Sequence, residues 1–400
     1  MTQAALVVAT IGHNMAQVPQ RRERCRRAMI ILTLRLMQLN VRITNLSQPI
    51  QRCNLRFNNQ RADTFTASFR FRQEHMSRLK ACLRIPRRVD IGNRVTVNGE
   101  EALLITLYLL ATGATQIMSE ERFGYEHTLL SRIKKAVIGI IVDNHAGKIM
   151  NNFDWHMEDS RLSKSRAAIR AKKRAESING LYHARTENVC LLVDGWRFVT
   201  SRPGQPADPF AWGHVVNIQK YMYSGHKKVH NLLFLVVVSA YGLIVDFAGP
   251  FNGRHNDLGG LRQSTLLPRF RQALLDNNLD VNSYDLLGDA IFPNAPNIRA
   301  LFGRKSMEGK PVEQGQNALD ECTRAPVEHS IGKMTQNWKA LKMKHDLKIL
   351  SGSLTKLARC CCILTNALTL FNGGQPLGQF FDANQPFRLQ MPTPEEYFDP

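Results

Sequence analysis

The chain has 400 residues, of which 44% are hydrophobic and 22% are charged, a balance typical of folded globular proteins and not of disordered ones. Its 53 lysines and arginines outnumber its 33 acidic residues, which gives a formal net charge of +20. This excess argues against basic partners and favours polyanions, with nucleic acid as the first to consider. The eight cysteines include no CxxC pair, and three are adjacent at 360–362, which argues against a secreted disulfide framework.

We expect neither a signal peptide nor a membrane span. The first twenty residues lack a basic segment ahead of an apolar one. The two most apolar stretches, 30–39 and 232–245, are interrupted by Arg35 and by Ser239 and Gly242, so neither offers a continuous run long enough for a bilayer.

A basic extension is predicted over residues 1–64. The first hundred residues hold 18 basic and 5 acidic side chains, and the densest cluster is 21–27. Such a run serves nuclear import or phosphate contact, or is simply a solvated arm, and the pattern alone leaves these readings open.

Helices are predicted over most of residues 65–150. One begins near Glu100 and ends at Thr112–Gly113, a second spans 115–122, and a third spans 126–142 after a turn that contains Gly124. Two helices joined by such a turn have the outline of a helix-turn-helix, and the second carries basic residues suited to DNA contact: Arg132, Lys134 and Lys135. Ordinary helix packing gives the same pattern.

Beyond residue 150 the composition and the spacing of the apolar residues change. A basic helical connector is expected over 151–188, with its helix at 161–174. Strand-like apolar runs follow at 189–196, 231–239, 243–248 and 284–289, and helices return from about residue 311. The acidic end of the chain, 392–400, is expected to be loose.

Three acidic residues stand where an active site would need them. Asp194 and Asp289 each lie in or directly after an apolar strand, and Glu328 lies in a predicted helix. An unpaired carboxylate in an apolar strand costs several kcal/mol, so a cation is expected to neutralise these groups. Mg²⁺ or Mn²⁺ suits hard oxygen ligands and supports phosphodiester chemistry. The alternative is that Asp194 and Asp289 cap turns or pair with arginines.

The stretch from Val189 to Leu370 resembles the endonuclease domain of the Harbinger (PIF) transposases, a DDE superfamily. The ordered motifs that carry the resemblance are Leu191–Phe198, Tyr223–His230, Tyr241–Asp257, Leu287–Pro293 and Arg324–Lys333. The likeness extends to about residues 65–375, because 97–142 is similar to the helical segment that precedes the nuclease in that family.

The resemblance implies an α/β fold: an RNase H-like mixed sheet of five strands flanked by helices over 189–375, preceded by the helix-turn-helix region and followed by a tail at 376–400. It also implies roles for individual residues. Asp194, Asp289 and Glu328 would be the catalytic, metal-binding triad, and Asp257 a further metal ligand, with a helix N-cap as the alternative for Asp257. The remaining roles are phosphate contacts by Lys227 and Lys228.

The implied activity is that of a metal-dependent DNA endonuclease or transposase in the nucleus, using Mg²⁺ or Mn²⁺. DNA would be its partner, a separate Myb-like protein could supply target choice, and the resemblance leaves room for a homo-oligomer. One departure is Trp196, where the family commonly has a small residue or Thr, and this ring is expected to narrow the DNA channel. The alternative function is a domesticated, catalytically silent DNA-binding or chromatin-interaction protein.

Overall fold

The computed structural model describes residues 28–33, 35, 55–176, 184–204, 218–349, 353–372 and 391–398. The chain divides into two units, Met1–Cys53 and Asn54–Pro400. In the first unit residues 28–33 and 35 are helical and exposed. The basic cluster at 21–27 lies outside the described residues.

The second unit begins with short helices and a two-stranded ribbon. These elements are η1 (Phe57–Asn59), α3 (Ala62–Phe69), η2 (Gln73–His75), α4 (Met76–Cys82), β1 (Arg88–Asp90) and β2 (Thr96–Asn98). The two strands pair antiparallel. Phe65, Phe69 and Met76 are fully buried, so this region joins the main core through its apolar side chains.

Three longer helices follow where the sequence predicts them: α5 (Gly99–Thr112), α6 (Gln116–Phe123) and α7 (His127–His145). Asn98 caps α5 by accepting from the Glu100 amide, and Thr115 caps α6 by accepting from the Met118 amide. Gly113 and Gly124 adopt the left-handed conformation at the C-terminal ends of α5 and α6. The predicted helix boundaries in this region are therefore confirmed to within a few residues.

A second helical stretch leads into the sheet: η3 (Ala146–Lys148), α8 (Phe153–Met157), η4 (Glu158–Ser160), α9 (Arg161–Glu176) and η5 (Ala184–Thr186). The predicted basic helix of the connector is α9, and it packs on the sheet. Ser165 donates a hydrogen bond of 2.6 Å to the Cys190 carbonyl, and Lys173 forms a buried ion pair with Asp320.

The centre of the unit is a mixed sheet of six strands, one more than predicted. They are β3 (Val189–Val199), β4 (Tyr223–Ser224), β5 (Val229–Ser239), β6 (Ile244–Asn252), β7 (Asp285–Gly288) and β8 (Ile298–Ala300). The order is β4-β5-β3-β7-β8, with β6 also paired to β5. β5 pairs antiparallel with both β3 and β6. β7 pairs parallel with both β3 and β8. The long runs of buried apolar residues in β3 and β5 fit strands covered on both faces.

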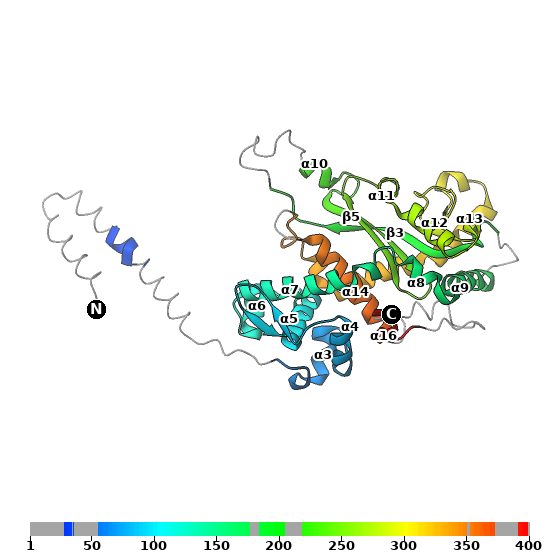
Figure 1. Ribbon diagram of the computed structural model, residues 1–400. Helices are drawn as coiled ribbons and strands as arrows, with labels where there is room; N and C mark the ends of the chain where they lie inside the picture. The colour runs from blue at the N-terminus through cyan, green and yellow to red at the C-terminus, as the bar shows by residue number, and fades with distance from the viewer. Residues whose placement is uncertain are drawn as a thin grey trace, which may run out of the picture. The chain divides into compact units, whose positions relative to one another are not determined.

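Helices cover the two faces of the sheet. The remaining helices of this part of the chain are α10 (Ile218–Met222), which directly precedes β4, and, after β6, α11 (Asp257–Gln263), α12 (Leu266–Asp276), η6 (Val281–Ser283), η7 (Arg304–Met307), α13 (Pro311–Asn337), η8 (Lys339–Lys342), α14 (Leu354–Phe371) and α16 (Pro394–Phe398). Figure 1 shows α11 and α12 on one side of β3 and β5 and α14 on the other. Leu191 and Val193 of β3 belong to the core under α12, and Leu192 and Trp196 to the core under α14.

Two predictions about single segments are wrong. The ring of Trp196 does not narrow a channel, because it is only 7% exposed and stacks on Phe198 in the core. The end of the chain is not loose at 394–398, because Tyr397 and Phe398 are buried. The Tyr397 hydroxyl accepts from Asn366 Nδ2 at 2.9 Å and donates to the Lys148 carbonyl at 2.8 Å.

Among the described residues, α14 is the one helix long and apolar enough to cross a membrane. A share of 78% of this helix is buried inside the structure. The helix contains the three adjacent cysteines, all fully buried. A mostly buried apolar helix of this kind is typical of the core of a folded protein.

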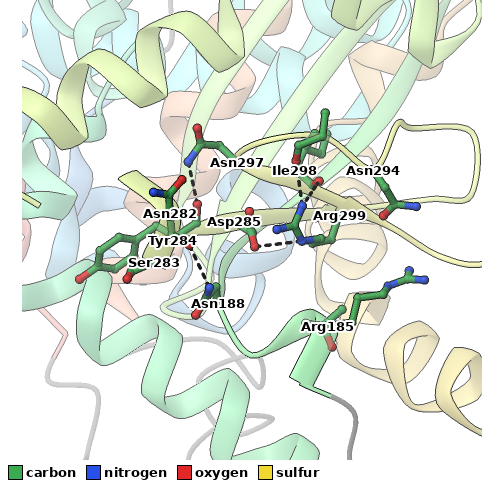
Figure 2. Close-up of polar contacts among 12 residues, drawn as sticks. Arg185, Asn188, Asn282, Ser283, Tyr284, Asp285, Asn294, Asn297, Ile298 and Arg299 are labelled. Carbon is green, nitrogen blue, oxygen red and sulfur yellow. Dashed lines mark hydrogen bonds and ion pairs between the residues drawn. The ribbon is translucent and has the colours of Figure 1, made fainter. Parts of the chain in front are cut away.

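The N-terminal ends of β3 and β7 are joined by a polar network (Figure 2). Arg299 Nε of β8 lies 3.2 Å from Asp285 Oδ2 of β7. Asn297 Nδ2 donates to the Tyr284 carbonyl at 3.0 Å, and Asn188 Nδ2 donates to the Asn282 carbonyl at 3.0 Å. These contacts hold together the residues at the N-terminal ends of the parallel strands.

Candidate active site

Asp194 lies in β3, and Asp289 directly follows β7, the parallel neighbour of β3. β3 and β7 are parallel, with Leu192 opposite Leu287. Two positions after this pair come Asp194, within β3, and Asp289, the first residue after β7. Leu192 and Leu287 belong to the core under α14, and because side chains alternate between the faces of a strand, Asp194 lies on that same face.

Asp257 approaches β3 from α11 on the opposite face. The N-cap of α11 is Asn256, whose side chain accepts from the Gly259 amide at 2.8 Å, so the alternative reading of Asp257 as the helix cap is wrong. Its carboxylate lies against Gly195, where an added Cβ would stand 2.2 Å from Oδ1. Gly195 is therefore required for the close approach of Asp257 to the strand.

One oxygen of Asp257 lacks a conventional partner. Oδ1 is buried and has no hydrogen-bond partner within the described part of the chain, and the nearest cation is Arg197 Nη2 at 3.8 Å. The same arginine is held by the Gly253 and His255 carbonyls at 3.1 and 3.0 Å. A buried carboxylate oxygen without a donor is costly and is free to bind a cation.

Glu328 lies on α13, one turn after Arg324. The Arg324 guanidinium is buried and forms ion pairs with both Asp194, at 3.2 Å, and Glu328. The Glu328 side chain is 56% exposed, whereas that of Asp194 is 19% exposed. The arginine thus links the strand carboxylate to the helix carboxylate.

Asp289 lies just beyond β7 and is half-buried. One of its oxygens accepts from the Ala290 amide at 2.5 Å, and its charge acts on Asp257. The contacts named in the alternative reading, a turn at Asp289 and an arginine on Asp194, are thus both present. These contacts involve Asp289 and Asp194, whereas the ion pair of Asp257 with Arg197 is long, at 3.8 Å.

The electrostatics of the cluster disfavour its full ionisation. Burial raises the pKa of Asp194 to about 6, although Arg324 opposes the rise, and the charge of Asp257 adds to it. Burial also raises the pKa of Asp257, with Arg197 opposing and Asp289 adding. The acidic side chains here therefore meet the guanidiniums of Arg197 and Arg324 and the charge of Lys227, while Asp194 and Asp289 each repel Asp257, a repulsion that a further cation would relieve.

The residues present fit a hard divalent cation by their chemistry. All four acidic side chains offer carboxylate oxygens, which Mg²⁺ and Mn²⁺ prefer, and the orphaned Oδ1 of Asp257 faces Gly195 of the strand that carries Asp194. In the arrangement described, no three His, Cys, Asp or Glu side chains stand close enough to form a metal cluster among the residues with described positions. Arg324 instead occupies the contacts of Asp194 and Glu328.

The predicted DNA contacts fall into two groups. Lys227 and Lys228 are exposed in the turn between β4 and β5, and the charge of Lys227 acts on Asp257. Of the three predicted contacts on α7, Lys135 is exposed, whereas Arg132 and Lys134 are half-buried. Arg132 donates to the Ile91 and Gly92 carbonyls at 3.0 and 2.5 Å, and Lys134 is half-buried, with its pKa lowered by burial.

Sequence reasoning missed the two arginines of the site. Arg324 precedes Glu328 by four positions, and this spacing on a helix predicts an ion pair. Arg197 follows Asp194 in the same strand, but nothing in the sequence shows that it faces α11. The approach of Asp257 to Gly195 likewise depends on the fold.

Comparison with known proteins gives one match. Residues 193–366 match the family model of the DDE superfamily endonucleases, and this stretch contains all four acidic residues of the cluster. No curated protein and no solved structure matches the chain. Residues 193–366 are thus similar to the DDE superfamily endonucleases, and the mixed sheet flanked by helices is consistent with that similarity.

Proposed function

We propose that this protein is a divalent-metal-dependent DNA endonuclease of the Harbinger transposase type. The observation that carries the proposal is the acidic cluster at the β3–β7 edge, which lies inside the segment matched by the endonuclease family. Asp257 is repelled by Asp289 and acts on Asp194 in turn, and a nuclease that uses metal needs several such oxygen donors.

Each acidic residue has a distinct place in this proposal. Asp194 and Asp289 would hold the metal from adjacent parallel strands, Asp257 from α11, and Glu328 from α13. A bound divalent ion would supply Lewis acidity toward the scissile phosphodiester and make water a better nucleophile. The protein's own part is to fix the carboxylates on rigid elements and to hold the DNA backbone beside them.

The exposed lysines of the β4–β5 turn would supply part of that hold. Lys227 and Lys228 are exposed there, and Lys227 is close enough to act on the charge of Asp257. We further propose that α6 and α7 act as a helix-turn-helix with Lys135 toward DNA, and that target choice uses a Myb-like partner in the nucleus. A protein with a net charge of +20 is expected to bind DNA with strong salt dependence.

A second candidate is a catalytically silent, domesticated DNA-binding protein. It is favoured by one observation, the ion pairs of Arg324 with Asp194 and Glu328. In this case Arg324 would permanently neutralise the carboxylates of a former active site.

Cleavage of supercoiled plasmid at low salt distinguishes the two candidates. The protein would be assayed with Mn²⁺, with Mg²⁺ and with chelator, beside Asp289→Asn and the exposed surface variant Asp276→Asn as a matched control. We expect metal-dependent nicking by the wild type and the control, none by Asp289→Asn, and equal DNA binding by all three. Equal inactivity of all three proteins, with no Mn²⁺ binding by calorimetry, would contradict the nuclease proposal.

A further inference from the structure

Arg324 is the most enclosed cation of the acidic site. Its side chain is 11% exposed, and it lies on α13 between buried Thr323 and half-buried Ala325. Its Nη1 faces Asp194 at 3.2 Å, and its Nη2 pairs with Glu328. One guanidinium thus connects a strand carboxylate to a helix carboxylate that the chain keeps far apart in sequence.

The two arginines of the site are held in different ways. Arg197 donates to the carbonyls of Gly253 and His255 and to Asn231 Oδ1 at 3.4 Å, so backbone groups fix its position whether or not Asp257 is charged. Arg324 Nε and Nη1 are buried and lack a well-directed hydrogen bond within the described residues. Apart from its packing, the Arg324 guanidinium is held by the two carboxylates.

This difference has an energetic consequence. A buried guanidinium needs compensating charge, and Asp194 and Glu328 supply it. They are also two of the four carboxylates that the proposed function assigns to the metal. A divalent ion and Arg324 therefore draw on the same two carboxylates, and their positive charges repel each other.

We propose that Arg324 is a positioning residue that holds Asp194 and Glu328 together in the metal-free protein and competes with the divalent metal for them. The inference rests on the proposed function, because it takes these carboxylates as metal ligands. Metal binding would then require the guanidinium to leave at least one of its two ion pairs.

Binding of Mn²⁺ alone tests this inference without any cleavage assay. Calorimetry and thermal unfolding, each with and without Mn²⁺, would be run on the full chain and on three variants. Arg324→Gln removes the competing charge, and Arg324→Lys keeps the charge but loses the planar fork that reaches two carboxylates. The matched control is Arg299→Gln, which removes the arginine that pairs with Asp285 at the other end of β7.

We expect Arg324→Gln to bind Mn²⁺ about tenfold more tightly than the wild type, on the order of one ion-pair energy. Arg324→Lys should fall between the two, and Arg299→Gln should bind Mn²⁺ as the wild type does. Without metal, Arg324→Gln should unfold at a lower temperature than the wild type, and Mn²⁺ should raise its midpoint by more.

The possible failures are distinguishable. If the wild type binds Mn²⁺ and folded Arg324→Gln and Arg324→Lys bind it no more tightly, the competition is refuted while the metal site stands. If neither the wild type nor any variant binds Mn²⁺, the proposed function is refuted and the inference with it. If Arg324→Gln does not fold, Arg324→Lys decides the question by the same affinity comparison.

Discussion

Acidic side chains lie at both ends of the β3–β7 strand pair, but the charges that neutralise them differ between the two ends. At the N-terminal end Asp285 is 3% exposed and lies 3.2 Å from Arg299 on the adjacent strand, so one carboxylate meets one guanidinium (Figure 2). At the C-terminal end several acidic side chains gather near Arg197, Arg324 and Lys227, and Asp257 is repelled by Asp289. Asp285 Oδ2 and Asp257 Oδ1 are both buried without a hydrogen-bond partner among the described residues, but the charge of Asp285 is matched by one arginine, whereas Asp257 also meets the charge of another carboxylate.

That difference separates a structural carboxylate from a functional one. Both Asp194 and Asp285 have pKa values raised by burial and lowered by an arginine, so burial alone does not tell them apart. The number of carboxylates gathered around each arginine does. Surplus carboxylates destabilise a fold unless a cation joins them, so their presence indicates a ligand.

The largest expected effect is on cleavage. Asp194→Asn should reduce metal-dependent plasmid nicking by about a thousandfold or more, because metal stabilisation of the developing charge is worth several kcal/mol. The same variant should keep its fold and its affinity for DNA. Nicking rates per folded protein and a DNA-binding isotherm measure the two properties, and wild-type nicking by Asp194→Asn would remove this residue from the active site.

The opposite end should respond in stability instead. Arg299→Gln leaves Asp285 buried without its cation, which is expected to cost about 3 kcal/mol of unfolding free energy. Denaturant unfolding in metal-free buffer measures this loss, and nicking per folded molecule should stay at the wild-type rate. A loss of nicking by Arg299→Gln without a loss of stability would erase the contrast between the two ends.

Much of this arrangement could be predicted from the sequence. The apolar runs around Asp194 and before Asp289 predict two strands that carry a carboxylate in or directly after them, although β3 continues beyond Asp194 to Val199. The caps at Asn98 and Thr115 and the glycines at 113 and 124 fixed the helix boundaries equally well, because these signals are local.

What the sequence could not indicate depends on contacts between distant segments. Arg132 stays a predicted DNA contact, and its guanidinium donates to the carbonyls of Ile91 and Gly92. Tyr397 lies in an acidic tail that reads as loose, yet its ring is buried against α14 and Asn366 binds its hydroxyl. Neither partner stands near in sequence, so local pattern could not indicate them.

A smaller effect should appear in the pH dependence of stability without metal. The pKa of Asp194 rises from the ordinary 3.8 to about 6 in the folded protein, so the native state binds its proton more tightly than the unfolded chain. This contribution therefore lowers stability as the pH rises from about 4 to about 6, by roughly 2 to 3 kcal/mol in total.

Asp194→Asn cannot ionise and should lack that fall. Unfolding free energies of the two proteins should therefore agree best near about pH 4 and diverge by about pH 7, with the variant the more stable. Asp276→Asn, an exposed aspartate on α12, controls for the general loss of charge. A constant difference between wild type and Asp194→Asn across this range would contradict the raised pKa.

The smallest expected effect compares exposed lysines at the two ends. Lys227 lies near Asp257 at the acidic end, whereas Lys164 is exposed on α9 between Ser163 and Ser165, which bind Tyr284 and Cys190 at the Asp285 end. Neither Lys227→Ala nor Lys164→Ala should change stability by more than about 0.5 kcal/mol, because both side chains are exposed.

DNA binding should nevertheless separate them. If Lys227 contacts one phosphate beside the acidic site, its loss should reduce the slope of log affinity against log salt by about one and weaken binding similarly on all sequences. Lys164→Ala should keep the wild-type slope, because the balanced end of the sheet offers nothing for DNA chemistry. Equal slopes for both variants would contradict the proposed phosphate contact of Lys227, whose charge acts on Asp257 of the acidic site.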